Sequence, residues 1–251
     1  MLVSIITPVH NSFSHIEDTI QSVLRQTFSD WELILIDDKS SDNGMDILAK
    51  YVRQDSRIRL LKNSKNRGAA ITRNKGIEAA EGRYIAFLDS DDLWEPEKLE
   101  TQLKFMIEND YAFSFTAYRK FKTEKIIGIQ EVPEKVTHQE LLKTCSIGCL
   151  TAMYDTEKLG KVYMPNISRR QDFALWLKLL KMVPYAYGLN IPLAKYRVRT
   201  DSISGNKFKA AKYQWRVYRE FEHLNLIQAS YYFIHYAFFG VLKTYLNKKE
   251  S

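Results

Sequence analysis

Acidic side chains gather at two places in the first hundred residues, each directly after a short apolar run. Asp37 and Asp38 follow one run, and residues 89–92, read as Asp-Ser-Asp-Asp, follow another. Carboxylates this close repel one another unless a cation binds them, and Mg²⁺ and Mn²⁺ prefer carboxylate oxygens together with water and phosphate. Arg67 and Arg73 supply charge that can pair with phosphate. An isolated Asp-x-Asp is typical of a solvated turn, but two acidic strand ends favour a site for a metal and a nucleotide.

The apolar runs that precede these residues alternate with segments of helical period. The expected strands are Val3–Thr7, Glu32–Ile36, Arg57–Leu61 and Tyr84–Leu88, and the expected helices are Ile16–Thr27, Met45–Gln54, Ala69–Ala80 and Glu97–Glu108. This alternation predicts an α/β fold with a mostly parallel central sheet flanked by helices. Ligands of such sheets bind beyond the carboxyl ends of the strands. We therefore expect the polar strand ends to meet at one edge.

The pattern changes after residue 110. Strands are expected at Ala112–Phe121, Leu150–Tyr154 and Tyr185–Val198, helices at His138–Thr144 and Phe173–Met182, and a charged loop or hairpin at Lys122–Lys135. We predict a catalytic domain over residues 1–204, with a nucleotide-binding half (1–105) and an acceptor-binding half (106–204). Residues 205–251 are expected to form a helical extension.

Composition narrows the classes further. The chain has 251 residues, 37 Lys and Arg against 30 Asp and Glu, and a formal charge of +7, which suits a partner that carries phosphate. Cys145 and Cys149 are the two cysteines, so neither a disulfide scaffold nor a zinc site is expected. No apolar stretch reaches the roughly 20 residues of a spanning helix. We expect a protein of the reducing cytoplasm.

Four segments together resemble a known family. "SIITPVHN", "LILIDDKSSD", "NRGAAITRNKGI" and "YIAFLDSDDLWEPEKLE" are similar to the family 2 glycosyltransferases. The resemblance is dense over residues 1–105 and thinner to about residue 205. It implies the GT-A nucleotide-sugar-binding fold, a UDP-sugar donor and Mn²⁺ or Mg²⁺.

The resemblance also implies roles for residues of the nucleotide half. His10 would stack on the base, Asp38 would accept a hydrogen bond from the uracil N3–H, and Asp91 would bind the metal. Alternatively, His10 merely caps its strand, and Asp37 holds its loop through backbone N–H groups. The nucleotide-binding set is Thr7, Pro8, His10, Asp38, Asn66, Arg73, Asp89, Ser90 and Arg199. Within this set, Asp89 and Ser90 would lie at the ribose and diphosphate.

The resemblance places a catalytic base at the start of a helix in the second half. The matching segment is Gln171-Asp172-Phe173, so Asp172 is the expected base, unless it is a simple N-cap. The departure is Gln171, where the family usually has an acid. Asp155 and Asp201 are the next choices for the base.

Arg199 stands where several family members have His. Arginine pairs bidentately with phosphate but cannot ligate a metal as imidazole can. We therefore expect Arg199 to clamp the diphosphate, the alternative being a solvated surface arginine.

The extension differs in kind from the rest of the chain. Residues 205–251 contain 8 Lys and Arg, 3 Asp and Glu, and 12 of the 32 aromatic residues. Basic helices with aromatic belts suit an anionic membrane surface. Packing on the catalytic domain, or on a second copy in a homo-oligomer, is equally compatible. Nucleic acid is not expected, because no motif for it accompanies the charge.

Taken together, the residues predict an inverting, metal-dependent glycosyltransferase that forms a β-linkage. The acceptor is expected to be a bacterial surface glycan or a lipid-linked oligosaccharide, reached from the cytoplasm or the inner face of the cytoplasmic membrane. One alternative is a non-catalytic nucleotide-sugar-binding partner in an assembly. Another is a sugar-nucleotide nucleotidyltransferase, although the first strand lacks the Gly-rich loop that such enzymes place after it.

Overall fold

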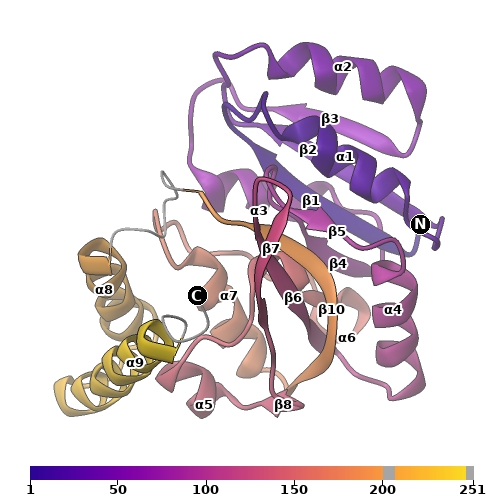
Figure 1. Cartoon of the computed structure of the whole chain (residues 1–251). Coiled ribbons are helices and arrows are strands. Elements are labelled where there is room, and N and C mark those ends of the chain that lie inside the picture. Colours follow the sequence, from indigo (N-terminus) through magenta and orange to yellow (C-terminus); the bar gives the residue numbers. More distant parts are fainter. Residues whose placement is uncertain (200–206, 247–251) are drawn as a thin grey trace.

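A mixed β-sheet forms the centre of the computed structural model, which describes residues 1–199 and 207–246 (Figure 1). Within these residues the strand order is β3-β2-β1-β4-β9-β6-β10-β5, with β7 beside β6 and β8 beside β10. The strands are β1 (Val3–Val9), β2 (Trp31–Asp37), β3 (Ile58–Lys62), β4 (Tyr84–Phe87), β5 (Leu93–Trp94), β6 (Phe113–Lys122), β7 (Lys125–Gln130), β8 (Lys135–Val136), β9 (Met153–Asp155) and β10 (Ala186–Arg197). The first four predicted strands, β1 to β4, run parallel to one another, which confirms the α/β class.

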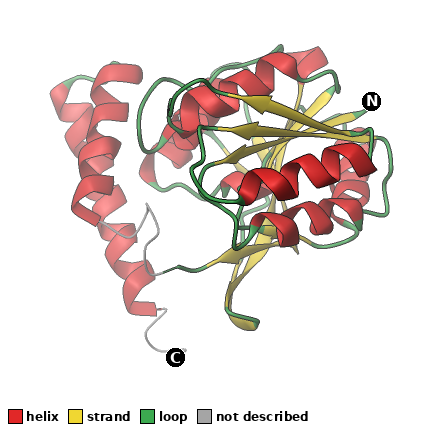
Figure 2. Ribbon diagram, turned by 90° about the horizontal axis from the view of Figure 1, so that it is seen from above, coloured by secondary structure: helices red, strands yellow, loops and turns green. Residues whose placement is uncertain are grey.

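Helices cover both faces of this sheet (Figure 2). They are α1 (Ile16–Leu24), α2 (Gly44–Gln54), α3 (Ala69–Ala79), α4 (Lys98–Glu108), α5 (His138–Lys143), α6 (Thr156–Leu159), α7 (Gln171–Leu180), α8 (Lys207–Arg216) and α9 (Leu226–Leu246). Successive side chains of a strand point to opposite faces. Ile5 therefore joins the core under α1, α2 and α4, whereas Ile6 joins the core under α3, α5 and α7.

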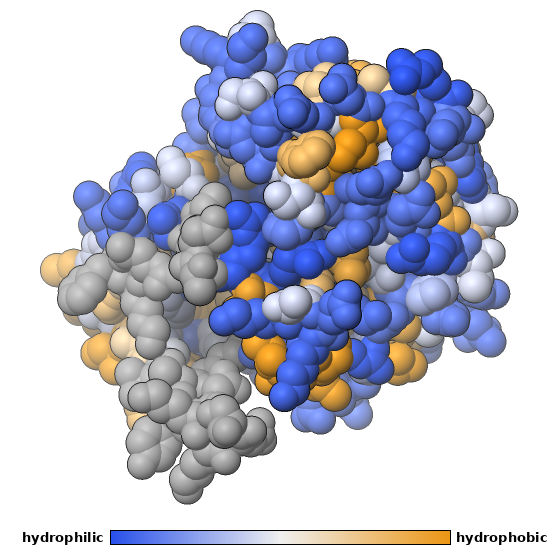
Figure 3. All heavy atoms as spheres, turned by 45° about the horizontal axis from the view of Figure 1, so that its top comes forward, coloured by the Kyte–Doolittle hydropathy of each residue, from blue (hydrophilic) through white to orange (hydrophobic). Residues whose placement is uncertain are grey.

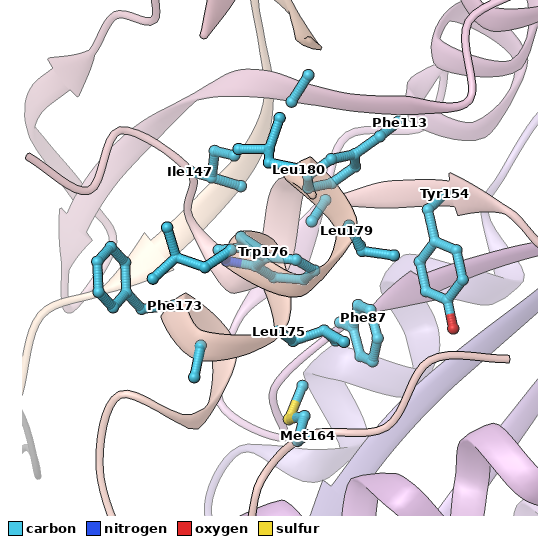
Figure 4. Close-up of a cluster of buried hydrophobic side chains, with 14 of the residues drawn as sticks. Phe87, Phe113, Ile147, Tyr154, Met164, Phe173, Leu175, Trp176, Leu179 and Leu180 are labelled. Carbon is cyan, nitrogen blue, oxygen red and sulfur yellow. The ribbon is translucent and has the colours of Figure 1, made fainter. Parts of the chain in front are cut away.

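Helix α7, which carries Asp172, is fixed by a buried tryptophan (Figure 4). The Trp176 ring lies 5.5 Å from the Phe87 ring and 5.4 Å from the Phe113 ring, centroid to centroid, and is 0% exposed. Phe87 is the last residue of β4, directly before the acidic loop. This packing therefore sets the start of α7 relative to the carboxyl end of β4.

The predicted helical extension is present, as two helices joined by the π-helical turn Val217–Phe221. Val217, Tyr218 and Ala229 are each 0% exposed and belong to the core under α7. No helix in residues 1–199 or 207–246 has the length and apolar character needed to cross a membrane.

Three local differences from the sequence expectations concern short elements. Strand β5 and helix α6 were not expected, and the segment expected to be a strand at Leu150–Tyr154 begins as the 3₁₀ turn Cys149–Thr151 before β9. These elements are only two to four residues long, and hydropathy patterns need longer windows to register.

Candidate active site

Side chains from four loops meet at the carboxyl edge of the parallel strands. The Ser12 hydroxyl, after β1, lies 2.7 Å from the Ser90 hydroxyl, after β4. The amide of Asn66, after β3, lies 3.1 Å from Nε2 of His10, after β1. Segments up to 78 residues apart in the sequence are thus joined. The polar strand ends lie together as their positions predicted.

Asp38 ties the loop after β2 to the loop after β3. Its Oδ1 accepts hydrogen bonds from the Asn63 amide and the Arg67 backbone N–H, and its Oδ2 accepts one from the Gly68 N–H, all at 2.8 Å. Burial alone would raise the pKa of Asp38, but these hydrogen bonds outweigh it and lower the pKa. Asp38 therefore holds these two loops together as an anion. Its contact with uracil stays a prediction.

Gly68 explains why this loop can reach Asp38. It has φ +81° and ψ 161°, a region of backbone conformations that is open essentially to glycine alone. The conformation directs its N–H to the Asp38 carboxylate just before α3 begins.

The exposed ring of His10 is held by two polar contacts. Its Nδ1 lies 3.0 Å from the Asp38 carbonyl oxygen, so Nδ1 carries the proton and Nε2 accepts from Asn66. A ring fixed and exposed in this way can stack on a base, and stacking by His10 stays a prediction. Thr7, in contrast, is 0% exposed, so its side chain supports the strand behind the site, and Pro8 beside it is half-buried.

The acidic loop after β4 divides into exposed and buried carboxylates. Asp89 and Asp91 are each 31% exposed, whereas Asp92 is only 2% exposed. Burial and the charge of Asp89 raise the pKa of Asp91, and burial with both neighbours raises that of Asp92 well above its ordinary value. A cation bound at this loop would offset the repulsion among the three carboxylates.

Two arginines near the end of β10 brace the acidic loop. The Arg197 backbone N–H donates to Asp92 Oδ1, and its Nε donates to the Asp91 carbonyl oxygen, both at 2.8 Å. Arg199 lies 3.5 Å from Asp91 Oδ2, and its contact with the diphosphate stays a prediction. His15 interacts electrostatically with Asp91, Arg197 and Arg199. Its burial and the charges of the two arginines together lower the pKa of His15. Arg197 and His15 were not among the predicted site residues.

Arg73 is the buried centre of the site. Its guanidinium donates to Asp89 Oδ1, is 6% exposed, and interacts electrostatically with Asp172 and Cys149. Burial alone would lower the pKa of Arg73, but the carboxylates of Asp89 and Asp172 outweigh it and raise the pKa. Its Nε and one terminal nitrogen have no hydrogen-bond partner in the described chain. Arg73 thus holds Asp89 from beneath, and direct contact with the nucleotide stays a prediction.

The first turn of α7 carries Asp172. The N-cap residue of α7 is Arg170, in the left-handed region at φ 63°, and no side chain caps the helix. Asp172 therefore is not the N-cap, the alternative weighed from the sequence. Gln171, the departure from the family pattern, has a buried Oε1 without a partner among the described residues. A neutral amide avoids the cost of a buried charge there.

The other two choices for the base are less suitable or outside the description. Asp155 is 0% exposed, pairs with Arg83 at 2.7 Å, and caps α6 by accepting from the Glu157 N–H. Its carboxylate is committed to structure. Asp201 lies outside the described residues.

The donor set fits a divalent cation held jointly with a phosphate. Within residues 1–199 and 207–246, no three His, Cys, Asp or Glu side chains are grouped as a complete metal site. Mg²⁺ and Mn²⁺ commonly take one or two carboxylates, with waters and substrate phosphates as the other ligands. Asp91, with Asp89 beside it, supplies such a pair.

A second concavity lies on the other side of the acidic loop. This open groove of about 1130 Å³ runs between α1 and β10, and His15 and Arg197 line its end nearest the site. Inside it, Glu95 already pairs with Arg119 at 2.6 Å and with Lys195 at 3.2 Å. Asp172 is not among the residues that line this groove.

Comparison with known proteins identifies relatives of this chain. The family model described as "Glycosyl transferase family 2" matches residues 4–154. The putative teichuronic acid biosynthesis glycosyltransferase TuaG of Bacillus subtilis (strain 168) is 50% identical over 94% of each chain. The UDP-Glc:alpha-D-GlcNAc-diphosphoundecaprenol beta-1,3-glucosyltransferase WfgD of Escherichia coli is 41% identical over 100% of this chain and 98% of its own.

Solved structures show the same fold. S. aureus TarS 1–349 in complex with UDP-GlcNAc superposes with a TM-score of 0.72 at 21% identity, over 92% of this chain and 69% of that one. The mannosyltransferase PcManGT of Pyrobaculum calidifontis, in complex with GDP-Man and Mn²⁺, gives 0.69 at 15% identity, over 88% and 64%. The chain spans between 41% and 69% of the TarS chains it matches. The GT-A-like architecture is therefore confirmed.

Proposed function

The chain belongs to glycosyl transferase family 2, and from this premise we propose that it is an inverting, metal-dependent transferase that uses a UDP-sugar. That it is a glycosyltransferase follows from the family; the donor, metal and stereochemistry are the proposal. The observation that supports it is the position of Arg73. This residue bonds Asp89 of the acidic loop and lies within electrostatic reach of Asp172 on α7. The buried guanidinium of Arg73 thus interacts both with Asp89, the carboxylate proposed for the donor side, and with Asp172, the one proposed for the acceptor side.

The proposed acceptor is a sugar hydroxyl on a lipid-linked oligosaccharide of a bacterial surface glycan. WfgD, and WfaP of Escherichia coli at 38% identity over 100% of this chain, are named for transfer from UDP-Glc to a sugar-diphosphoundecaprenol. UDP-glucose is therefore the first donor to test. Such a lipid carrier is confined to a membrane, so the proposal also places the enzyme peripherally at the inner face of the cytoplasmic membrane.

Each residue has a defined chemical role in this proposal. Asp172 accepts the proton of the acceptor hydroxyl as that oxygen attacks the anomeric carbon opposite the leaving diphosphate. Asp91 and Asp89 would hold Mn²⁺ or Mg²⁺, which when bound neutralises charge on the diphosphate. Arg199 pairs with the same phosphates, and Arg73 keeps Asp89 in place. A single displacement inverts an α-linked donor into a β-linked product.

The test is removal of the base with the fold left intact. In Asp172→Asn, kcat should fall by roughly 10²–10⁴-fold while UDP affinity stays nearly unchanged. The matched control is Asp46→Asn, which removes an exposed acid from the first turn of α2 and should leave kcat unchanged. An Asp172→Asn enzyme with more than half of the original kcat would place the base elsewhere.

The same assay separates the alternative functions. Wild-type protein is incubated with several UDP-sugars, and UDP release is followed with and without lipid-linked acceptor. Binding of UDP without transfer or hydrolysis of any donor would indicate a non-catalytic binding partner. Release of pyrophosphate from UTP and a sugar phosphate would indicate a nucleotidyltransferase.

A further inference from the structure

Helix α9 has two apolar faces, and only one of them packs on the protein. On the inner face, Ala229 is 0% exposed, Phe233 stacks edge-on against Trp215 at 5.5 Å, and Tyr232 lies 6.2 Å from the Tyr218 ring. The outer face consists of Ile227 (82% exposed), Tyr231 (48%), Ile234 (67%) and Phe238 (59%). These four recur at i, i+4, i+7 and i+11, which places them in one row on a helix.

This row, here called the outer stripe, is continued by further apolar surface. Leu226 is 63% exposed and Phe239 is 40% exposed, and no charged residue occurs from Leu226 to Gly240. In Figure 3 hydrophobic side chains are visible at the left edge of the molecule, the side on which α8 and α9 lie in Figure 1. Between α9 and α5 runs a cavity of about 440 Å³, lined by Leu142, Ile227 and Tyr231 among others. A contiguous patch of this kind marks an interaction surface.

The charge of the segment that carries the outer stripe indicates the kind of partner. Residues 207–246 contain six Lys and Arg against two Glu. Both acids are held in ion pairs, Glu220 with Arg216 at 2.8 Å and Glu222 with Lys181 at 2.7 Å. Lys143 of α5 lies over the Tyr231 ring of the stripe, 5.9 Å from its centroid. Residues 207–246 thus carry a formal charge of +4 (six basic minus two acidic residues), and Lys143 adds a positive charge beside the stripe.

A second copy of this chain is disfavoured by the same charge. In a two-fold dimer each patch faces its own copy, so two positive segments would be brought together. An anionic bilayer has the opposite sign, and its headgroup region accepts aromatic and aliphatic side chains together with basic ones.

We propose that the outer stripe of α9 docks the protein on an anionic lipid surface, with Ile227, Tyr231, Ile234 and Phe238 inserted among the headgroups. The inference rests on the proposed function in one respect: a lipid-linked acceptor is reached from such a surface, which gives the docking its purpose.

The inner face of α9 contacts the segment that precedes the helix of the base. Tyr236 of α9 receives a hydrogen bond from Arg170, which immediately precedes the helix of the base. Docking would therefore connect the lipid surface with the start of α7, through α9 and this hydrogen bond.

The test uses co-sedimentation with vesicles that contain no acceptor. Wild-type protein should pellet with vesicles of equal parts phosphatidylglycerol and phosphatidylcholine, less so at high salt, and should stay in the supernatant with pure phosphatidylcholine. The triple variant Ile227→Gln, Ile234→Gln, Phe238→Gln should lose at least tenfold in binding. The control Ile126→Gln, Ile127→Gln, Ile129→Gln removes three other exposed apolar side chains, from β7, and should bind as the wild type does.

The outcomes separate this inference from the proposed function. Thermal melting and UDP binding check that each variant folds, and neither readout needs transfer activity. Docking is overturned if the wild type fails to pellet with the anionic vesicles, or if the α9 variant pellets as well as the β7 control. A lipid-free dimer, detected by light scattering and dissociated by the α9 variant alone, would assign the stripe to a second copy instead.

Discussion

At the scale of single residues, the site is built from charges that hold one another in place. Arg73 lies beneath the surface and bonds the partly exposed Asp89, and Arg197 bonds the backbone of Asp91 and the carboxylate of the buried Asp92. Buried charges are costly unless paired. Their arrangement here is consistent with a loop preorganised for a divalent cation and a diphosphate.

Metal dependence is the first prediction at this scale. Asp91→Asn removes the partly exposed negative charge that lies 3.5 Å from Arg199, so transfer should fall by about 10²–10³-fold while the melting temperature stays close to that of the wild type. EDTA should abolish wild-type transfer, and added Mn²⁺ or Mg²⁺ should restore it. Full turnover after metal removal would contradict the assignment.

The nucleotide contact of Asp38 can be separated from its role in the loop. Asp38→Ala should weaken UDP binding by about ten- to a hundredfold, the equivalent of about 1–3 kcal/mol for a lost polar partner. Asn63→Ala removes a loop hydrogen bond to Asp38 and leaves the carboxylate. If Asp38 recognises uracil, competition assays should show that Asp38→Ala loses the preference for UDP over GDP and that Asn63→Ala keeps it. Equal loss of that preference in both variants would leave Asp38 as a loop anchor only.

Sequence patterns located most of these residues but not their partners. The strand ends were predictable because hydrophobic periodicity marks where strands stop. The contacts of Arg197 with residues 91 and 92 span more than 100 positions, and no local pattern reveals such pairs. The bond from Arg73 to Asp89 joins two segments 16 positions apart, and the sequence expectation, which concerned the nucleotide alone, did not include it.

At the scale of elements, the strength of the helical signal decided what could be predicted. Helix α7 was expected because Phe173, Trp176, Leu177 and Leu180 share a face, and these residues are buried. The π-helical turn between α8 and α9 leaves no signature of composition, so the sequence predicted a helical extension but not where the first helix ends. The hydrogen bond from Arg170 to Tyr236 could not be foreseen either, because it joins two elements 66 residues apart.

That hydrogen bond gives a prediction for α9. Tyr236→Phe keeps the ring but removes the acceptor for Arg170, so the left-handed residue before α7 becomes less restrained. Since such a bond is worth about 0.5–1.5 kcal/mol, kcat should fall by roughly two- to tenfold, with little change in the KM for donor. The control is Tyr232→Phe, which removes a hydroxyl one turn earlier on the same helix. Identical kcat in both variants would show that α9 does not influence the base.

At the scale of the whole molecule, one buried acid joins the C-terminal helices to the catalytic domain. Glu222 is 3% exposed in its side chain and accepts from Lys181 of the α7 end at 2.7 Å and from His138 of α5 at 2.8 Å. Burial alone would raise the pKa of Glu222, but the hydrogen bonds from His138 and Lys181 outweigh it and lower the pKa. The folded protein therefore favours the carboxylate form.

The lowered pKa makes part of the stability dependent on pH. A group whose pKa is lower in the folded state stabilises it above the ordinary value, here 4.5, and loses that contribution as the pH falls through the folded value. Glu222→Gln should lower the free energy of unfolding by about 1–3 kcal/mol at neutral pH, because Lys181 and His138 lose the carboxylate that accepts their hydrogen bonds. The difference from wild type should shrink below about pH 4.5. Urea titrations of both proteins at several pH values measure this difference.

The control Glu220→Gln removes an exposed ion pair with Arg216 and should change the free energy of unfolding little. A difference that is constant with pH would mean that the carboxylate charge does not hold the C-terminal helices on the domain.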